Sequence, residues 1–319
     1  MEKKMNKTDK AIEKYCDMMI KRINELKEGW RKTWLSVECN GEPVNADGRK
    51  YNSMNAFMLY LITEFEGYRY PVFVTYNKAK QLGAHVKKGE TAFPVIFWKW
   101  MAKTDTGEYI DAKDAGENDK VFPILKTFDV FNVDQTTIEE DAPEWFAKLQ
   151  KRYKTPTLNG TDGMYVNEQM DALIGGEWVC PIHTKKQDRA CYSPAKDVIT
   201  LPTKEQFNDG KNAYEGGMEF YAAALHEMAH STGSEKRLNR TMKGFFGGKD
   251  YGREELVAEL TAAICGHNLG FNTRVQDNNA AYLSSWLKQI KEEPKYLVSV
   301  LSDVSKAVGM IEGEIAKVG

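Results

Sequence analysis

Apolar positions recur every three or four residues in two stretches near the start of the chain. The first stretch runs from 9 to about 29 and has apolar side chains at Ile12, Cys16, Met19, Ile20, Ile23 and Leu26. The second lies within 45–67, opens with turn residues and continues with Met54, Phe57, Met58 and Leu61. Because an α-helix repeats every 3.6 residues, both patterns predict helices with one apolar face.

Extended segments follow these two helices. The sequence from 70 to 90 predicts a short strand, a helix over roughly 75–82 and a turn centred on glycine. Residues 91–102 and 124–135 are rich in β-branched and aromatic side chains and predict two strands. The segment between them, 103–120, is acidic and rich in turn residues, so we interpret it as a hairpin loop or an insertion.

The second half has mainly helical patterns. An acidic, proline-containing stretch at 136–145 predicts a domain boundary, which divides the chain into domains 1–138 and 139–319. The patterns after it predict a short helix near 143–153, a strand at the end of 188–202, and helices at 219–232, 253–270, 275–291 and 294–316. The predicted fold class is α+β, with a mixed front domain and a mostly helical second domain that holds a small sheet.

Composition restricts the class of protein. The 319 residues are 42% hydrophobic and 28% charged, as expected for a globular chain. The formal charge is -2 overall, but residues 1–100 carry 18 Lys+Arg against 12 Asp+Glu, which suggests an anionic partner for the front half. The five scattered cysteines, the polar N-terminus and the short apolar run at 93–98 predict a reduced, cytoplasmic protein with no membrane partner.

The sequence HEMAH at 226–230 contains the first candidate chemistry. His226 and His230 are one helical turn apart and therefore share a face, so both imidazoles can bind one Zn²⁺ ion. Glu227 lies one step around the helix, where it can take a proton from the metal-bound water as a catalytic base. Gly233 is placed to end the helix. The alternative is a chance pair of histidines on a helix surface.

A third ligand is available on the next predicted helix. Glu255 and Glu259 are four residues apart and share a face, and their order after HExxH resembles that of the Glu-ligand zincins. In that arrangement Glu255 binds the metal and Glu259 holds the outer nitrogen of a ligand histidine, whereas Glu254 faces solvent. Alternatively, these glutamates form a solvated helix face. Tyr251 is a candidate for stabilising an oxyanion.

Two further features of the second half leave alternatives open. The strand at 195–202 is either an active-site edge strand, along which an extended peptide could pair, or an ordinary core strand. Cys180, His183 and Cys191 could form a second metal site, but their spacing matches no standard zinc finger, and buried thiols with a surface histidine are the favoured interpretation.

Aromatic and basic residues are interleaved in the front half, and this pattern suits single-stranded nucleic acid. Unpaired bases stack on aromatic faces while cations follow the phosphates. The candidate DNA-binding residues are Trp30, Arg31, Lys32, Trp34, Arg49, Lys50, Tyr51, Asn52, Tyr76, Lys78, Lys87 and Lys88. The alternative is that these aromatic side chains belong to the core and the lysines to an ordinary solvated surface.

Longer motifs connect the two halves to one known family. The segments PVNADGRKYNSMN, QLGAHVKKGETAFPVIFW and VFNVDQT resemble the N-terminal single-stranded-DNA-binding domain of ArdC-like antirestriction proteins. The segments DVITLP, LHEMAHSTG, RLNR and YGREELVAEL resemble the zincin-like metallopeptidase domain of the same proteins. The resemblance implies a protein of plasmids or other mobile elements, acting in conjugation, that protects incoming single-stranded DNA.

Three functions are consistent with these features. The first is an antirestriction protein that binds single-stranded DNA and cleaves a protein substrate at one Zn²⁺ ion. The second is a DNA-protecting protein whose metal site is structural and not catalytic. The third is a cytosolic zinc peptidase without DNA affinity, whose front domain selects protein substrates.

Overall fold

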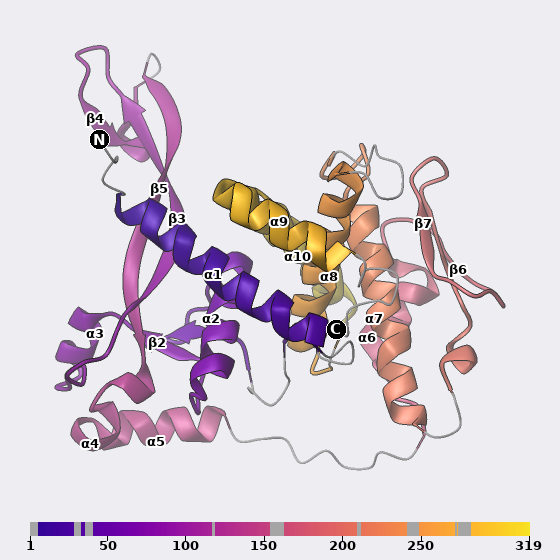
Figure 1. Cartoon of the computed structure of the whole chain (residues 1–319), viewed down its shortest axis with the longest axis horizontal. Coiled ribbons are helices and arrows are strands. Elements are labelled where there is room, and N and C mark those ends of the chain that lie inside the picture. The colour runs from indigo at the N-terminus through magenta and orange to yellow at the C-terminus, as the bar shows by residue number, and fades with distance from the viewer. Residues whose placement is uncertain are drawn as a thin grey trace.

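The computed structural model describes residues 6–28, 33–35, 41–116, 119–153, 163–208, 212–240, 249–271, 273 and 282–319. The front half combines three helices with a five-stranded sheet of order β1-β2-β5-β3-β4 (Figure 1). Its elements up to the end of the sheet are α1 (Lys7–Glu28), β1 (Val44–Asn45), α2 (Ser53–Glu66), β2 (Val72–Val74), α3 (Tyr76–Gln81), β3 (Phe93–Lys103), β4 (Tyr109–Asp111) and β5 (Lys120–Asn132). The predicted helices and strands of this half are therefore confirmed.

Local sequence explains where these elements begin and end. The Asn52 side chain accepts a hydrogen bond from the Asn55 amide and so caps the start of α2. Gly67 ends α2 in a left-handed conformation, with φ of 65°, that a residue with a side chain rarely adopts. In the same way the Thr75 hydroxyl accepts from the Lys78 amide and caps α3.

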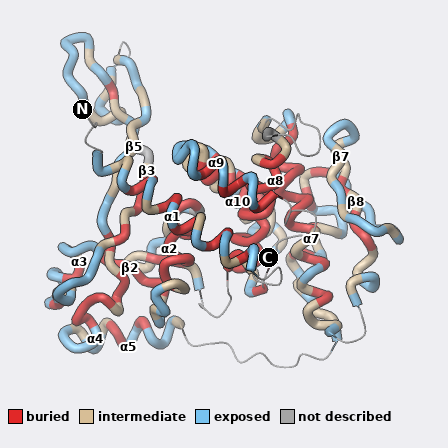
Figure 2. Tube along the Cα trace, in the orientation of Figure 1, coloured by how far each residue is buried: buried red, intermediate tan, exposed pale blue. Residues whose placement is uncertain are grey.

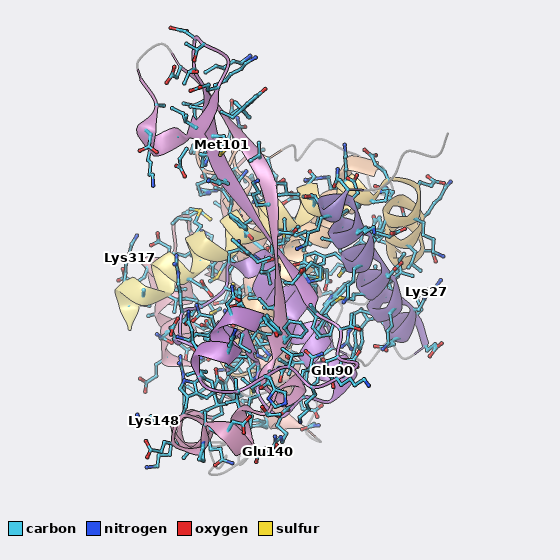
Figure 3. The ribbon with its side chains drawn as sticks, turned by 90° about the vertical axis from the view of Figure 1, so that its left-hand side faces the viewer. Lys27, Glu90, Met101, Glu140, Lys148 and Lys317 are labelled. Carbon is cyan, nitrogen blue, oxygen red and sulfur yellow. The ribbon has the colours of Figure 1, made fainter. Side chains whose placement is uncertain are left out.

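Strands β3 and β5 form a long antiparallel ribbon that stands away from the rest of the molecule (Figures 1 and 3). The register pairs Phe93 with Val130 at the base and Lys103 with Lys120 near the tip. Segment 103–120 lies at the tip and contributes β4, which pairs with the end of β3. The hairpin interpretation of this segment is therefore confirmed.

Helices α4 (Ile138–Asp141) and α5 (Pro143–Arg152) pack on the front half (Figure 1). Ile138, Phe146 and Leu149 belong to a small hydrophobic cluster together with valines of β1 and β2. This packing joins both helices to the front half, whereas the predicted boundary at 138/139 places α5 and most of α4 in the second domain.

The second half consists of helices and a three-stranded sheet that packs against α7 at the edge of the molecule (Figure 1). Its elements are α6 (Glu168–Ala172), β6 (Ile182–Thr184), β7 (Cys191–Ser193), β8 (Val198–Leu201), α7 (Ala213–Thr232), α8 (Lys249–Asn268), α9 (Leu283–Glu292) and α10 (Pro294–Val318). The sheet order is β6-β8-β7, so β8 is the central strand and both of its edges are paired. The possibility that 195–202 is an edge strand open to a peptide is therefore wrong.

One hydrophobic core extends through both halves. Helices α1 and α2 contribute Met19, Ile23 and Phe57, and α8 and α10 contribute Leu256 and Leu301, all less than 1% exposed. Figure 2 shows the buried segments meeting where α1 and α2 lie beside α8, α9 and α10. Among the described residues, no helix has the length and apolarity needed to cross a bilayer.

Candidate metal centre

The HExxH sequence lies in the C-terminal part of α7, which packs against α8. His226 and His230 are 3% and 9% exposed, and their Nε2 atoms are 3.0 Å apart. The helix ends with Gly233 as its cap, as the sequence predicted. Two imidazole nitrogens at this distance need a proton or a cation between them, since both neutral rings would otherwise present lone pairs.

Glu255 of α8 completes a group of three possible ligands. One Glu255 oxygen lies 3.4 Å from His226 Nε2 and the other lies 3.7 Å from His230 Nε2. The three ligand atoms are within 4.8 Å of one another, and this is the one such group that the described residues contain. The Glu255 Oε2 atom is buried and has no hydrogen-bond partner of proper geometry. Two imidazole nitrogens and a carboxylate that lacks a partner fit a divalent metal ion.

The charges around this group also favour a cation. Four carboxylates, those of Glu227, Glu254, Glu255 and Glu259, are each at most 6% exposed. Burial opposes charge on His230, but the Glu254 and Glu255 carboxylates outweigh it and raise the pKa of His230 to about 10. Burial likewise opposes charge on Glu255, yet hydrogen bonds to the two histidines hold the pKa of Glu255 below its usual range.

Glu259 lies behind His226, with its Oε1 4.0 Å from His226 Nδ1. Its other oxygen accepts a 3.1 Å hydrogen bond from the indole Nε1 of Trp34. Trp34 is fully buried and cannot stack on a base, so its predicted DNA-binding role is wrong. Instead, an indole from the front half holds the carboxylate beside a histidine of the second half.

Glu254 lies behind His230, and the expectation that it faces solvent is wrong. It is 5% exposed, and its Oε1 is 3.4 Å from His230 Nδ1. Arg240 binds both Glu254 oxygens, at 2.6 and 3.0 Å, and also donates to the Ala229 carbonyl at the end of α7. The helical spacing missed this pair because Arg240 lies on the chain between the two helices; the RLNR motif was the available signal.

Two other predictions concern the second half, one for Tyr251 and one for a second metal site. Burial, the charge of Glu255 and a hydrogen bond to it raise the pKa of Tyr251, so this phenol lies beside the candidate ligand Glu255. His183 and Cys191 pair with Thr200 from opposite sides of β8, so two strand spacings of about 4.8 Å separate them. A second metal site at Cys180, His183 and Cys191 therefore has no support.

The remaining predicted DNA-binding residues occupy different environments. Trp30, Arg31 and Lys32 lie outside the described residues. Arg49, Tyr76, Lys87 and Lys88 are exposed, and Tyr76 is 59% exposed.

Four other candidates have partners within the chain. Lys50 pairs with Glu42, and Lys78 pairs with Asp47. Tyr51 is partly buried edge-on against Phe73, and Asn52 caps α2, so both have structural roles.

The structure reveals an exposed aromatic surface that the sequence interpretation missed. Of the six large hydrophobic side chains exposed among the described residues, Trp100, Val121 and Phe128 lie on the ribbon and Tyr109 lies on β4 beside it. The register places Tyr109, Phe128, Lys103, Lys120 and Lys126 on one face, named here the ribbon face, and Trp100 on the other. Strand alternation from a known register was the signal that could have found it.

Comparison with known proteins gives the two halves their relatives. Residues 9–131 match the family model for the N-terminal domain of anti-restriction factor ArdC, and residues 168–302 match that of a zincin-like metallopeptidase. The metal-free crystal structure of antirestriction protein ArdC from plasmid R388 superposes with a TM-score of 0.70 and 28% identity, covering 95% of this chain and 98% of that one. This chain belongs to the ArdC-like antirestriction family.

One related structure contains a metal ion, and one related protein is much longer than this chain. The Mn(II)-bound structure of the R388 protein matches with a TM-score of 0.68 and 27% identity, over 95% of this chain and 98% of that one. DNA primase TraC of Escherichia coli is 32% identical over 296 residues, which are 90% of this chain. The chain spans only 19% of the length of TraC.

Proposed function

We propose that this ArdC-like chain is a cytoplasmic antirestriction protein that binds single-stranded DNA with its front half and hydrolyses a protein substrate at a zinc centre in its second half. The observation that carries the enzymatic part is the buried group of His226, His230 and Glu255 with the Glu227 carboxylate beside it. The DNA-binding part rests on the ArdC domain at 9–131 and on the exposed aromatic and basic side chains.

The side chains of the centre have separate tasks in this proposal. His226, His230 and Glu255 would hold the ion, which when bound supplies a Lewis acid that polarises a peptide carbonyl. Glu227 is the general base, and its carboxylate lies close enough to interact electrostatically with both His230 and Tyr251. It takes the proton of the attacking water and passes it to the leaving amine. Tyr251 is the hydrogen-bond donor for the developing oxyanion.

Single-stranded DNA is proposed to lie across the ribbon face. Tyr109 and Phe128 are 63% and 56% exposed and offer faces to unpaired bases. Lys103, Lys120 and Lys126 are exposed on the same face and can follow the phosphates. The exposed Arg49, Tyr76, Lys87 and Lys88 extend the candidate surface over the rest of the front half.

Replacement of Glu227 by Gln tests the enzymatic part. We expect zinc affinity and DNA affinity to stay within about threefold, while protection of incoming DNA in a restricting host falls, because a general base contributes roughly 10²–10⁴ in rate. Glu219→Gln, an exposed position on the same helix, is the matched control. Full protection by Glu227→Gln would exclude the peptidase account and favour a structural metal site.

Gel shifts on a single-stranded oligonucleotide test the DNA-binding part. Phosphate contacts release counterions, so affinity should fall as salt rises. Tyr109→Ala or Phe128→Ala should weaken binding by about 5- to 150-fold, since one base stack is worth roughly 1–3 kcal/mol. Trp100→Ala, on the opposite face, is the matched control. Equal losses for Trp100→Ala and Tyr109→Ala would contradict the ribbon face, and no binding at all would contradict single-stranded DNA as the partner.

A further inference from the structure

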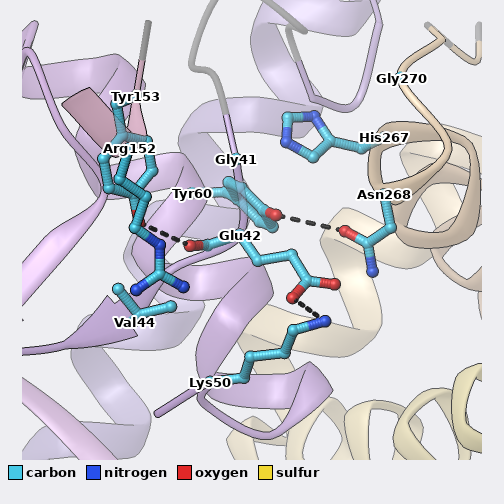
Figure 4. Close-up of a pocket in the computed structure, with 10 residues that line it drawn as sticks. All are labelled: Gly41, Glu42, Val44, Lys50, Tyr60, Arg152, Tyr153, His267, Asn268 and Gly270. Carbon is cyan, nitrogen blue, oxygen red and sulfur yellow. Dashed lines mark hydrogen bonds and ion pairs between the residues drawn. The ribbon is translucent and has the colours of Figure 1, made fainter. Parts of the chain in front are cut away.

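A pocket of about 470 Å³ lies between the front half and the C-terminal end of α8 (Figure 4). Arg152 and Tyr153 at the end of α5 line one side, and His267 and Asn268 line the other. His267 follows Glu255 by twelve residues on the same helix, which is about 18 Å along its axis. The pocket is therefore separate from the metal centre.

The first wall carries two cations. Among the described residues, no carboxylate lies within ion-pair distance of the Arg152 guanidinium, which stands over the Tyr153 ring at 5.8 Å from its centroid. Lys50, the second cation, pairs with Glu42. Because Glu42 balances Lys50 and no carboxylate among the described residues balances Arg152, this wall has a net positive charge, which suits an anionic ligand.

Backbone conformation keeps this wall in place. Gly48 has φ of +80°, and a Cβ atom there would lie 2.6 Å from an Arg152 Nη atom. Gly41 has φ of +88°, and a Cβ atom there would lie 2.7 Å from the Tyr153 ring. Glycine at both positions lets the chain approach the two side chains closely. The exposed Arg152 side chain and the half-buried Tyr153 ring thus lie directly against glycine backbone.

The side chains that line the second wall are polar or aromatic and uncharged, and behind them the Glu312 carboxylate accepts a 2.6 Å hydrogen bond from Asn268 Nδ2. His267 is 8% exposed, packs on the Tyr60 ring with centroids 4.2 Å apart, and has a buried Nδ1 without a hydrogen-bond partner. Burial lowers the pKa of His267 to about 4, so the imidazole is neutral at pH 7. The Tyr60 hydroxyl donates to Asn268 Oδ1 at 3.2 Å. A neutral wall of this kind suits the sugar and base of a ligand whose charge lies elsewhere.

We propose that this pocket binds a nucleotide, with its phosphate on Arg152 and Lys50 and its base toward Tyr60 and His267. Its volume falls within the range of small-molecule sites, about 300–1,000 Å³. The phosphate can belong to a free mononucleotide or to a single strand, and only the second source rests on the proposed DNA binding. In either case Lys50 exchanges Glu42 for the phosphate.

Calorimetric titration of the full chain tests the proposal. One titration uses thymidine 5′-monophosphate, and a parallel one uses a 5′-phosphorylated single-stranded oligonucleotide. We expect Arg152→Ala to weaken binding of at least one probe by tenfold or more, which is about 1.4 kcal/mol. Lys151→Ala, the exposed neighbour on the same helix, should stay within about twofold. Arg152→Lys should recover part of the loss, because the charge is kept and the planar fork is not.

The two probes separate this proposal from the one on DNA binding. A mononucleotide that binds in an Arg152-dependent way supports the pocket even if the chain has no affinity for single strands. An oligonucleotide that binds equally well to the Arg152→Ala and Lys151→Ala variants, with no binding of the mononucleotide to the unaltered chain, overturns the pocket and leaves DNA binding intact. Thymidine and inorganic phosphate, each titrated alone, should bind more weakly than the mononucleotide.

Discussion

The hydrogen bond from Trp34 to Glu259 predicts that a side chain of the front half sets the metal affinity of the second half. Trp34→Phe keeps most of the buried ring and removes only the indole N–H, which lies 3.1 Å from Glu259 Oε2. Glu259 faces His226 Nδ1 at 4.0 Å, so a carboxylate that loses its donor orients this histidine less well.

The size of the effect follows from the kind of bond. A hydrogen bond to a charged group contributes roughly 1.5–3 kcal/mol, and each 1.4 kcal/mol is tenfold in a binding constant. Zinc affinity of Trp34→Phe should therefore fall by about 10- to 100-fold, which is also the usual cost of losing a group that holds a ligand histidine.

Competition with a chromogenic chelator measures this affinity directly. Trp145→Phe is the matched control, because Trp145 is partly buried in the separate cluster around α5. Both variants should remain folded, as judged by far-ultraviolet circular dichroism. Zinc affinity of Trp34→Phe within twofold of the unaltered chain would refute the reasoning, whatever the change in thermal stability.

Three further predictions concern stability. Glu254→Gln leaves the Arg240 side chain, which is only 4% exposed, without its carboxylate partner. The free energy of unfolding, measured by urea titration, should fall by about 3–5 kcal/mol. A loss below about 1 kcal/mol would contradict a buried ion pair. Hydrogen bonds from Arg237 hold the pKa of Asp197 at about 2, so this carboxylate stabilises the fold above its unfolded pKa near 4. The stabilisation is lost as pH falls toward 2. The difference in free energy of unfolding between the unaltered chain and Asp197→Asn should therefore shrink between pH 6 and pH 3. Zinc at a hundredfold excess over its dissociation constant should stabilise the chain by about 2.7 kcal/mol, and His230→Ala should abolish the shift in melting temperature.

Local spacing was sufficient to predict the two helices that bear the candidate ligands. His226 and His230 share a face because four residues make one helical turn, and Glu255 and Glu259 do so for the same reason. The start of α2 and the end of α7 likewise follow from Asn52 and Gly233, which act within one turn of their own chain. These features depend on neighbours in sequence, so a single sequence contains them.

Contacts between distant segments were beyond the reach of such patterns. Trp34 and Glu259 are separated by 225 positions, so the same aromatic-basic motif that suggested DNA stacking could not reveal that Trp34 is buried. Glu254 lies 100° around its helix from Glu255, so the helical pattern predicted that it faces solvent. In the structure it pairs with Arg240, and both side chains are buried.

The amino-acid sequence by itself determined the helices, the candidate ligand residues and the family resemblance, because each rests on short-range spacing. Only the tertiary structure decided that β8 is a central strand, that one face of the ribbon gathers Tyr109 and Phe128 with lysines, and that Arg152 meets His267 across a pocket. Strand order, register and packing between the halves depend on which surfaces bury one another. These contacts join segments that are distant in sequence, so short-range patterns do not contain them.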